Sequence, residues 1–572
     1  MYLATTSDCS LWEGDNVLLL GEWCKTPFNK VERSSFKIDT FPPIWENPQM
    51  IGENILYCHE TYKILLQVLT SKLNECHAIK KSEAYYEIIL GYWLHTFIHQ
   101  ARDKYLTLKK VMLAYKDIIT CGVEGPATIP LDPTDAISII QTDEFALHMY
   151  SDISEHIGLK IVSKKKENKQ HDEVIYKKQY SFSEKLNDIL LKAFSYLSGI
   201  GVKKEVLLVK PYFSSHTKKS FFELIKSSQG KILFSELTFE YSIKTKINKK
   251  QRSESLDIQG DEFQRFLAKI VLKHIPITFL EGYKSLVDQV DNIKLPKSIN
   301  TFFTRSAINS HLIYKFLLAR NINDVQNIVM QHGGGYGIKA YSLAEIYETS
   351  VSNKFYTFGW NDRFKLPMPL NTFISKNQNK IVFGTNEHPR YLVRIDNHPI
   401  TSQYINETVK NWFNFFNQCS FRNEIQFRCQ GLGKSQWDYP LEKLIHDNQI
   451  DNFSQSFLET LKETKLFITD QCETTFLESL AYNVPTVVYF TKKYYDFRDE
   501  CKFYIDALHK AKIVHYDPLE AAKFCNEIVE NIEEWWFSDL VQNARQNFIK
   551  KYMWTETEWS RYWVDAITSN TI

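Results

Sequence analysis

The chain has 572 residues, more than a single hydrophobic core usually supports, so we expect two domains with a cleft between them. Apolar residues make up 44% and charged residues 24%, values typical of soluble globular proteins. The 69 basic and 68 acidic residues nearly cancel, so the overall charge argues against a nucleic-acid partner.

Cysteine spacing and the distribution of apolar residues indicate the cellular compartment of the protein. The ten cysteines are scattered without a C-x-x-C pair or a zinc-like Cys/His grouping, which indicates reduced thiols in a cytoplasm. No stretch approaches the ~18 apolar residues of a membrane span, and residues 1–13 lack the pattern of a signal peptide. We therefore expect a cytoplasmic protein whose contact with the inner membrane would be peripheral, on its cytoplasmic face.

In the first half of the chain, short apolar runs predict strands separated by helices. The run Val17–Leu20 ends at a glycine and places Glu22 at a strand end, near a cleft. Residues 50–120 carry apolar side chains at helical spacing and predict a helical insertion or layer. Segments 205–210 and 230–234 predict further strands, and this alternation favours an α/β fold.

Two polar segments, residues 164–172 and 244–260, interrupt this half. The second holds five basic side chains within nine residues, from Lys244 to Arg252. Such charge runs are typical of solvated, mobile loops. The alternative is a basic arm that contacts anionic lipid or an anionic acceptor.

From about residue 320 the alternation of strands and helices becomes clearer. The predicted strands are 327–330, 354–360, 381–384, 424–428, 466–470 and 485–490. Prolines and polar residues between 367 and 380 predict a linker. We therefore predict a Rossmann-like unit in the second half, facing another in the first.

The strongest local signal is the run Gly333, Gly334 and Gly335, which follows His332 at the end of a predicted strand. Consecutive glycines there let the backbone approach a ligand and present amide donors to it. The spacing is neither the dinucleotide fingerprint nor a P-loop, and no G-x-S-x-G element accompanies the esterase-like H-G-G-G. His332 is a candidate acid/base or phosphate donor; the alternative is a histidine that only caps its own loop.

Carboxylates supply further catalytic candidates. Glu345 and Glu348 lie three residues apart on the helix predicted after the glycine run, so they share one face. Glu348 and Glu22 are both catalytic candidates, and the alternative for the helical pair is an ordinary solvated face. No Asp-x-Asp motif occurs, which argues against the metal-dependent glycosyltransferase plan, and we predict neither a metal nor a cofactor.

The second strong signal is the segment 470–485, which predicts a strand, a hydroxyl-rich turn and a helix. Thr474 and Thr475 can cap the helix and donate hydroxyls to a phosphate, and Glu478 can accept from ribose hydroxyls. The alternative is an ordinary helix cap with a surface glutamate. Other polar side chains at predicted strand ends suit diphosphate or carboxylate recognition, with surface ion pairs as the alternative for the arginines. They are His388, Arg390, Arg428 and Gln430.

Several motifs together resemble one known family. They are LGEWC at 20–24, YEIILGYW at 86–93, IP at 275–276 with EGY at 281–283, QHGGGYG at 331–337, FGW at 358–360 and TTFLESLAYNVP at 474–485. On these residues the chain is similar to the leptospiral-type family of surface-polysaccharide (O-antigen and capsule) transferases. That family is similar in plan to the capsule-synthesis enzymes that use CMP-activated keto-sugar acids. The likeness spans nearly the whole chain, and QHGGGYG is its most specific motif.

The resemblance implies a GT-B-like α/β fold, with two Rossmann-like domains facing a cleft and a helical insertion in the first. Residues 1–372 would form the acceptor-side domain and residues 373–545 the domain that binds the nucleotide-sugar. Residues 546–572 would form a C-terminal helix that packs back on the first domain.

The resemblance also implies a metal-independent glycosyltransferase. The donor would be a CMP-activated nonulosonic acid of Kdo, pseudaminic or legionaminic type, and the acceptor a glycan or lipid-linked glycan of a bacterial surface polysaccharide. Some relatives retain configuration through a nucleophilic aspartate, and no position here matches that residue. Two alternatives stay open: a CDP-glycerol-type polyol-phosphate transferase, which shares a His-Gly element, and a non-catalytic polysaccharide-assembly protein.

Overall fold

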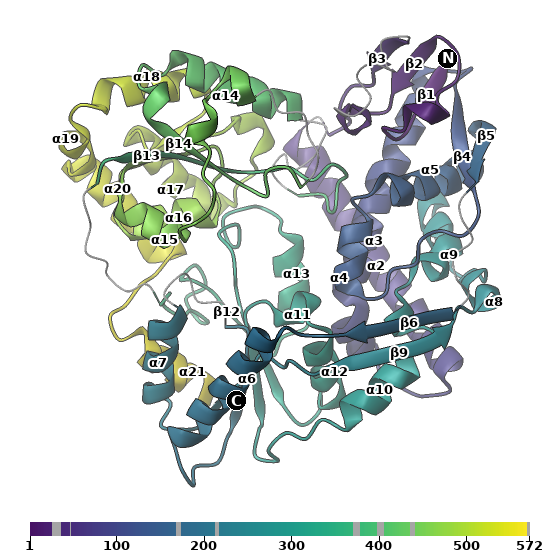
Figure 1. The fold of residues 1–572 in the computed structure, drawn as a ribbon, viewed down its shortest axis with the longest axis horizontal. Coiled ribbons are helices and arrows are strands. Elements are labelled where there is room, and N and C mark those ends of the chain that lie inside the picture. Colours follow the sequence, from purple (N-terminus) through teal and green to yellow (C-terminus); the bar gives the residue numbers. More distant parts are fainter. Residues whose placement is uncertain are drawn as a thin grey trace.

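The computed structural model describes residues 1–25, 36–45, 47–166, 173–211, 217–369, 378–396, 405–434 and 441–568. These residues form three five-stranded parallel sheets and one two-stranded antiparallel ribbon. Parallel strands need long crossover connections, and helices supply them here, so the chain is an α/β protein, as predicted. The three sheets and their helices lie around a common centre (Figure 1).

The first sheet has the strand order β3-β2-β1-β4-β5. Its strands are β1 (Tyr2–Ala4), β2 (Asn16–Leu19), β3 (Lys37–Thr40), β4 (Ile119–Glu124) and β5 (Lys160–Lys166). Its helices are α2 (Pro48–His77), α3 (Glu83–Ala114), α4 (Pro133–Ile139) and α5 (Asp143–Ile157). The helical pattern of residues 50–120 therefore belongs to a crossover within a sheet of its own. The sequence predicts only β2 of this sheet, because β1 has three residues and polar or charged side chains interrupt the apolar runs of β3, β4 and β5.

The second sheet has the order β12-β11-β10-β7-β8. Its strands are β7 (Val206–Val209), β8 (Ile232–Phe234), β10 (Thr301–Thr304), β11 (Gln326–Met330) and β12 (Lys354–Tyr356). Its helices are α6 (Phe182–Leu197), α7 (Thr217–Ser227), α9 (Glu262–His274), α10 (Tyr283–Asp291), α11 (Ala307–Ser310), α12 (Leu312–Arg320) and α13 (Leu343–Ser350). The glycine run follows β11, the strand next to the sheet edge.

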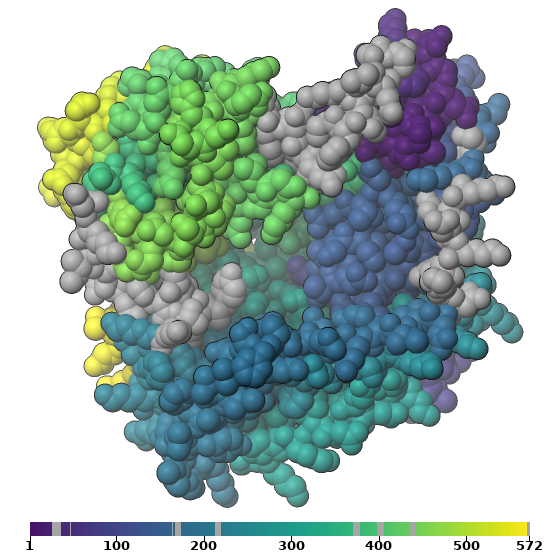
Figure 2. Space-filling view, in the orientation of Figure 1, coloured from purple at the N-terminus to yellow at the C-terminus, as the bar shows by residue number. Residues whose placement is uncertain are grey.

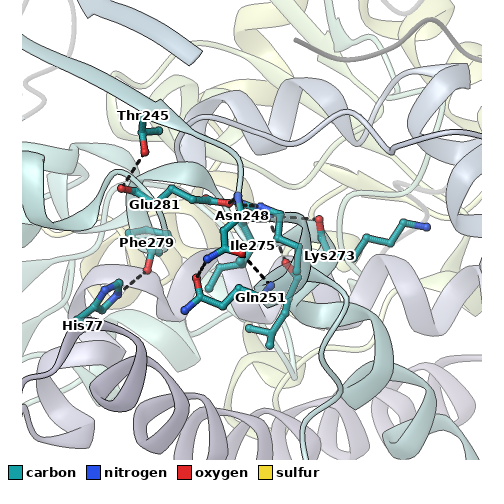
Figure 3. Close-up of polar contacts among 10 residues, drawn as sticks. His77, Thr245, Asn248, Gln251, Lys273, Ile275, Phe279 and Glu281 are labelled. Atoms are coloured by element: carbon teal, nitrogen blue, oxygen red, sulfur yellow. Dashed lines mark hydrogen bonds and ion pairs between the residues drawn. The ribbon is translucent and has the colours of Figure 1, made fainter. Parts of the chain in front are cut away.

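A ribbon of β6 (Glu173–Lys178) and β9 (Tyr241–Lys246) runs into helix α8 (Lys249–Arg252). The prediction of a mobile loop is therefore wrong for residues 244–252. The guanidinium of Arg252 is buried, donates to Glu281 over 2.7 and 2.6 Å, and caps the carbonyls at the end of α9. Figure 3 shows the acceptors Glu281, Lys273 and Ile275 of this cluster. A paired cation at a helix C-terminus orders the segment around it.

The third sheet has the order β14-β13-β15-β16-β17, and every strand predicted for it is present. Its strands are β13 (Lys380–Asn386), β14 (Ile425–Gln430), β15 (Thr464–Thr469), β16 (Thr486–Tyr489) and β17 (Val514–His515). Its helices are α14 (Ile405–Gln418), α15 (Phe457–Lys462), α16 (Thr474–Ala481), α17 (Asp499–Lys510), α18 (Pro518–Ile528), α19 (Ile532–Trp536) and α20 (Asp539–Tyr552). Helix α20 runs through the predicted boundary at 545/546, and the boundary at 372/373 lies outside the described residues.

The C-terminal helix α21 (Trp559–Thr568) returns to the second sheet. The indole of Trp563 donates to the carbonyl of Pro367 over 2.8 Å and lies 5.3 Å from the ring of Phe303 on β10. The indole of Trp559 donates to Glu223 on α7 over 2.9 Å. Two Rossmann-like sheets joined by a returning C-terminal helix have the GT-B-like plan that the sequence predicts, and the first sheet is an addition to it.

Short 3₁₀ helices complete the described chain. They are η1 (Cys9–Leu11), η2 (Glu22–Cys24), η4 (Ile277–Phe279), η6 (Arg422–Glu424), η7 (Leu441–Lys443), η8 (Asp447–Gln449) and η9 (Lys492–Tyr494). No helix among the described residues combines the length and the apolar sequence that a membrane crossing requires.

Apolar packing joins the three units. Successive side chains of a strand point to opposite faces, and β7 divides its side chains in this way. Leu207 and Val209 pack into a cluster shared with the first sheet and its helices. Val206 and Leu208 pack into a cluster shared with α16, α17, α20 and α21. The second sheet is therefore the central layer, and the glycine run lies at its junction with the third unit.

Candidate active site

The glycine run makes a backbone contact with the third unit. The amide of Gly334 donates to Oγ1 of Thr474, the first residue of α16, over 3.0 Å. A Cβ on Gly334 would lie 2.5 Å from the nitrogen of Thr474, closer than real Cβ atoms approach. A Cβ on Gly333 would lie at 3.6 Å from its nearest neighbour, an ordinary contact. Gly334 thus permits close packing between units, and its amide is already used by Thr474.

The end of the glycine loop is held by charged side chains. Gly337 has a φ of +69°, and its amide donates to Glu345 over 3.0 Å. Glu345 also forms an ion pair with Arg498, the residue that precedes α17. Beside Gly335, the side chain of Lys339 approaches so closely that an added Cβ would lie 2.9 Å from its Cε. Of the two predicted helical carboxylates, Glu345 therefore holds the loop to the third unit.

His332 is paired with the second of those carboxylates. Its Nδ1 lies 3.1 Å from Oε1 of Glu348, which is completely buried on α13, whereas 30% of the His332 side chain is exposed. The same oxygen accepts from the hydroxyl of Tyr336 over 3.0 Å and from the amide of Asn309 over 2.6 Å. Three neighbours thus fix the carboxylate, and the carboxylate and the Tyr336 hydroxyl together orient the imidazole.

This arrangement leaves one imidazole nitrogen available for chemistry. Nδ1 lies 2.9 Å from the hydroxyl of Tyr336, its hydrogen-bond partner, and 3.1 Å from Glu348, so when Nδ1 carries the proton, Nε2 is the unprotonated acceptor. Among the described residues, His332 Nε2 has no hydrogen-bond partner. A histidine oriented by a buried carboxylate is the general-base part of a catalytic triad. Burial, with the nearby charge of Glu348, raises the pKa of Tyr336 well above its usual range, so its hydroxyl stays a donor.

Helix α16 carries three predicted nucleotide-binding residues. Thr474 and Thr475 form its first turn, and Glu478 follows one turn later, half-buried. Burial raises the pKa of Glu478 to about 7, and the charge of Arg305 opposes this shift. Arg305 is buried after β10, and its Nε donates to the carbonyl of Gln331 over 3.1 Å. Arg305 is therefore a common neighbour of Glu478 and of the start of the glycine loop.

Arg390 links the third unit to the first instead of facing the glycine loop. Its guanidinium pairs with Asp143 at the start of α5 and donates to the hydroxyl of Ser7 over 2.8 Å. The hydroxyl of Tyr391 donates to the same carboxylate. The predicted diphosphate role has no support in these contacts, and the ion-pair alternative describes them.

Arg428 is also occupied by protein groups. It donates to Asp451 over 2.7 Å and to the carbonyl of Gln455 over 3.1 Å, and its guanidinium lies 4.3 Å from the ring centre of Phe453. Of the other two strand-end candidates, His388 is buried in the loop after β13 and Gln430 is exposed at the end of β14. These contacts and positions do not place the three residues beside His332.

Glu22 lies in a different unit from the histidine. It begins η2 after β2, and its carboxylate pairs with Lys25 over 2.9 Å. Its contacts among the described residues do not include the His332–Glu348 pair. Within the same part of the chain, no group of three or more His, Cys, Asp and Glu side chains could hold a metal ion.

Two basic residues that the sequence analysis missed lie near the glycine loop. The ammonium of Lys339 pairs with Glu473 at 2.6 Å and with Asp396 at 3.5 Å. Arg394 pairs with the same Asp396 at 3.2 Å and is close enough to Tyr336 to lower its pKa. Arg394 follows a strand end, the same signal that selected Arg390, whereas Lys339 lies in a segment with no clear pattern.

Two recesses flank this centre, and Figure 2 shows the surface hollowed where the units meet. One, of about 350 Å³, lies between α4 and the ends of β13 and β14, and is lined by Arg394 and Lys434. The other, of about 770 Å³, is lined by carboxylates, lysines and tyrosines from α4, the ribbon and α6. Ser310 and His311 also line it, directly after the Asn309 that binds Glu348.

Three solved structures are weakly similar to the chain. MurG of Acinetobacter baumannii is 11% identical with a TM-score of 0.30, over 64% of this chain and 99% of that one. The glycosyltransferase SnogD of Streptomyces nogalater is 10% identical with a TM-score of 0.33, over 64% and 100%. The spinosyn rhamnosyltransferase SpnG is 8% identical with a TM-score of 0.28, over 63% and 96%.

Comparison by sequence gives a more specific result. No curated protein matches the chain. One family model does match it, that of the LIC12162 family transferases, over residues 1–567. The match includes the glycine loop, the His332–Glu348 pair and helix α16. The chain therefore belongs to the LIC12162 family of transferases.

Proposed function

We propose that this chain is a glycosyltransferase that moves a nonulosonic acid of Kdo, pseudaminic or legionaminic type from a CMP-activated donor to a bacterial surface polysaccharide. The observation that carries the proposal is the His332–Glu348 pair, whose partly exposed imidazole lies where the second sheet meets α16. Transfer of a sugar to a hydroxyl group needs a general base that accepts the hydroxyl proton. A histidine held by a buried carboxylate has the arrangement of such a base.

In the proposed reaction, Nε2 of His332 accepts the proton of an acceptor hydroxyl. The hydroxyl oxygen attacks the anomeric carbon, a new C–O bond forms, and the bond from that carbon to the phosphate oxygen breaks to release CMP. Glu348 stabilises the imidazolium through Nδ1. Because Glu348 is completely buried, it is a positioning residue and cannot itself reach the sugar. A direct displacement of this kind inverts the anomeric configuration.

The donor would lie against the third unit. The first turn of α16 presents a helix N-terminus, which favours a phosphate, and Glu478 can accept from ribose hydroxyls. Arg394 lines the recess of about 350 Å³ and supplies a guanidinium for the diester or for the carboxylate of a keto-sugar acid. The choice of CMP over other nucleotides rests on the resemblance of motifs such as QHGGGYG and TTFLESLAYNVP to the leptospiral-type family, which is similar in plan to the enzymes that use CMP-activated sugars.

The acceptor would lie in the recess of about 770 Å³. Its lining combines carboxylates such as Asp132 and Glu236 with the aromatic rings of Tyr176 and Tyr180. Carboxylates accept from sugar hydroxyls, and aromatic rings cover the apolar faces of sugar rings. A glycan in this recess would approach His332 past Ser310 and His311.

The test measures binding and turnover in the same variants. Among CMP, UDP, GDP and CDP-glycerol, we expect CMP to raise the melting temperature of the parent most. His332→Ala should keep this stabilisation while turnover of a CMP-sugar falls roughly 10²-fold or more. Glu22→Gln serves as the control and should stay within a few-fold of the parent.

Each other outcome points to a different function. Stabilisation by CDP-glycerol in preference to CMP would support the polyol-phosphate transferase. No stabilisation by any nucleotide would support a non-catalytic assembly protein. A His332→Ala variant that turns over like the parent would leave His332 as a residue that caps its loop.

A further inference from the structure

Helix α6 buries its polar face and exposes its apolar face, the reverse of an ordinary surface helix. Its buried face is polar: Asp188 accepts from the hydroxyl of Ser235 over 2.9 Å and from the hydroxyl of Thr238 over 2.9 Å. One and two turns later, Lys192 pairs with Asp188, and Ser195 accepts from the amide of Phe234 over 3.0 Å. The helix is therefore held to the second sheet largely by hydrogen bonds.

The opposite, outward face of α6 is apolar. Phe182, Ile189 and Leu197 are 81%, 61% and 67% exposed, and Leu186, Leu190, Phe194 and Tyr196 are exposed beside them. Beyond the helix the surface continues to Ile200, 85% exposed, and across to Phe222 of α7, whose ring lies 5.5 Å from that of Phe194. We call these nine side chains the α6 face. An ordinary surface helix turns such residues inward, and a contiguous exposed set marks an interaction surface.

Basic side chains surround the α6 face. Between Lys177 and Lys231 the sequence has 11 lysines and 4 acidic residues, although the whole chain is almost neutral. Lys204 is buried, and Lys185, Lys192 and Lys231 form ion pairs with Glu240, Asp188 and Glu205. Lys203, Lys219 and Lys226 are exposed on the elements that carry or border the face. An amphipathic helix with an apolar outward face and flanking lysines has the composition of helices that lie in the headgroup region of a bilayer.

We propose that the α6 face docks the protein on an anionic lipid surface, with its apolar side chains inserted among the headgroups. A second copy of the chain fits this face less well. A symmetric dimer would bring the same surface of each copy together and so oppose lysines to lysines. Anionic headgroups instead complement the lysines while the acyl boundary takes the apolar side chains.

Docking in this way would also orient the recess of about 770 Å³. Glu184 and Asn187 of α6 line that recess, so the proposed contact holds it at the lipid surface. Figures 1 and 2 show α6 on the viewer's side of the molecule, below the central hollow. This step rests on the proposed function: it predicts a lipid-linked glycan acceptor, whose sugar would enter the recess while its lipid stays in the bilayer.

The test is cosedimentation of the full chain with vesicles, which needs no donor or acceptor. We expect binding to phosphatidylcholine vesicles with 30% phosphatidylglycerol, and binding at least tenfold weaker to phosphatidylcholine alone. The double variant Ile189→Ser/Leu197→Ser should bind the anionic vesicles at least tenfold more weakly than the parent. Leu113→Ser, at a leucine near the end of α3 that is more exposed than either of these residues, is the control and should bind like the parent.

Other results would overturn the proposal and not the glycosyltransferase function. Equal vesicle binding by the parent and the double variant would exclude the α6 face. A parent that binds no vesicles but forms a dimer by light scattering, with the double variant monomeric, would assign the face to a second copy. If the parent binds no vesicles and stays monomeric, the α6 face does not bind lipid and the proposal is wrong. Melting temperatures within about 2 °C of the parent would show that the substitutions leave the fold intact.

Discussion

The amide of Gly334 donates a 3.0 Å hydrogen bond to Oγ1 of Thr474, and this contact joins the glycine loop of the second sheet to the first turn of α16 in the third unit. The ion pair between Lys339 and Glu473, at 2.6 Å, lies directly beside it. His332 precedes this contact on one side, and Glu478 follows it on the other. The distance between the proposed base and the proposed ribose acceptor is therefore set by close backbone packing.

We predict that Gly334→Ala destabilises the protein while Gly333→Ala does not. The added Cβ at Gly334 would meet backbone atoms of Glu473 and Thr474 at 2.6 and 2.5 Å, which cannot move like a flexible side chain. Overpacking of this kind typically costs about 1–3 kcal/mol of the free energy of unfolding. At Gly333 the nearest atoms lie at 3.6 and 3.7 Å, so this variant is the matched control. Urea denaturation measures both, and equal stability of the two variants would contradict the packing role.

We predict that Glu348→Gln lowers kcat strongly and KM little. Glutamine keeps the shape of the side chain but cannot stabilise the imidazolium that forms on His332. Loss of this support should cost roughly 10²- to 10⁴-fold in kcat. Because Glu348 is completely buried, CMP affinity and KM should stay within a few-fold of the parent. A variant whose KM rises while kcat is unchanged would instead give Glu348 a role in binding, through the packing of Tyr336 and Asn309.

The sequence predicts the second and third sheets well and the first poorly. Runs such as Leu466–Asp470 have enough apolar residues between turn signals to identify a buried strand. In the first sheet, β1 has only three residues, and charged side chains interrupt β3 and β5. In the second sheet, the four-residue β10 does not stand out from the surrounding apolar positions. The sequence also does not predict that the polar face of α6 points inward, because amphipathic spacing alone does not tell which side of a helix packs on the sheet.

The candidate site could be predicted in part for a related reason. Position in the chain selects His332 and Glu478 as candidates, since His332 follows the end of β11 and Glu478 lies one turn into α16, the helix after β15. The partner of a charged side chain is decided by tertiary packing, and sequence position does not reveal it. Arg390 and Arg428 resembled ligand-binding arginines, yet Asp143 and Asp451, far along the chain, are their partners.

We predict that turnover needs no divalent metal. The N-terminus of α16 and basic side chains such as Arg394 and Lys339 lie around the proposed phosphate position and can offset the charge of the leaving CMP. The rate in excess EDTA should equal the rate without it. Loss of activity in EDTA that Mg²⁺ or Mn²⁺ titration restores would contradict this expectation.

The last prediction concerns the ionisation of Glu478 and its effect on the pH dependence of stability and of nucleotide binding. Burial raises the pKa of this carboxyl from 4.5 to about 7, so between these values the folded state binds more protons than the unfolded state. The contribution of Glu478 to the free energy of unfolding is then fully present below pH 4.5 and is lost as the pH rises through 7. Glu478→Gln keeps a neutral side chain at every pH. The variant should therefore gain stability over the parent at pH 8 and not at pH 4.5.

The affinity for CMP should change with pH in the opposite direction, rising as the pH rises. A ribose hydroxyl donates more strongly to a carboxylate than to a carboxylic acid, so CMP should favour the ionised form of Glu478. With a pKa of about 7, the ionised fraction rises roughly tenfold between pH 6 and 8, and the CMP affinity of the parent should rise by up to that factor. Calorimetry on the parent and on Glu478→Gln separates this effect from the titration of the CMP phosphate, which is common to both proteins. If both proteins show the same pH slope, the ribose hydroxyls do not bind Glu478, and another acceptor on the third unit must hold them.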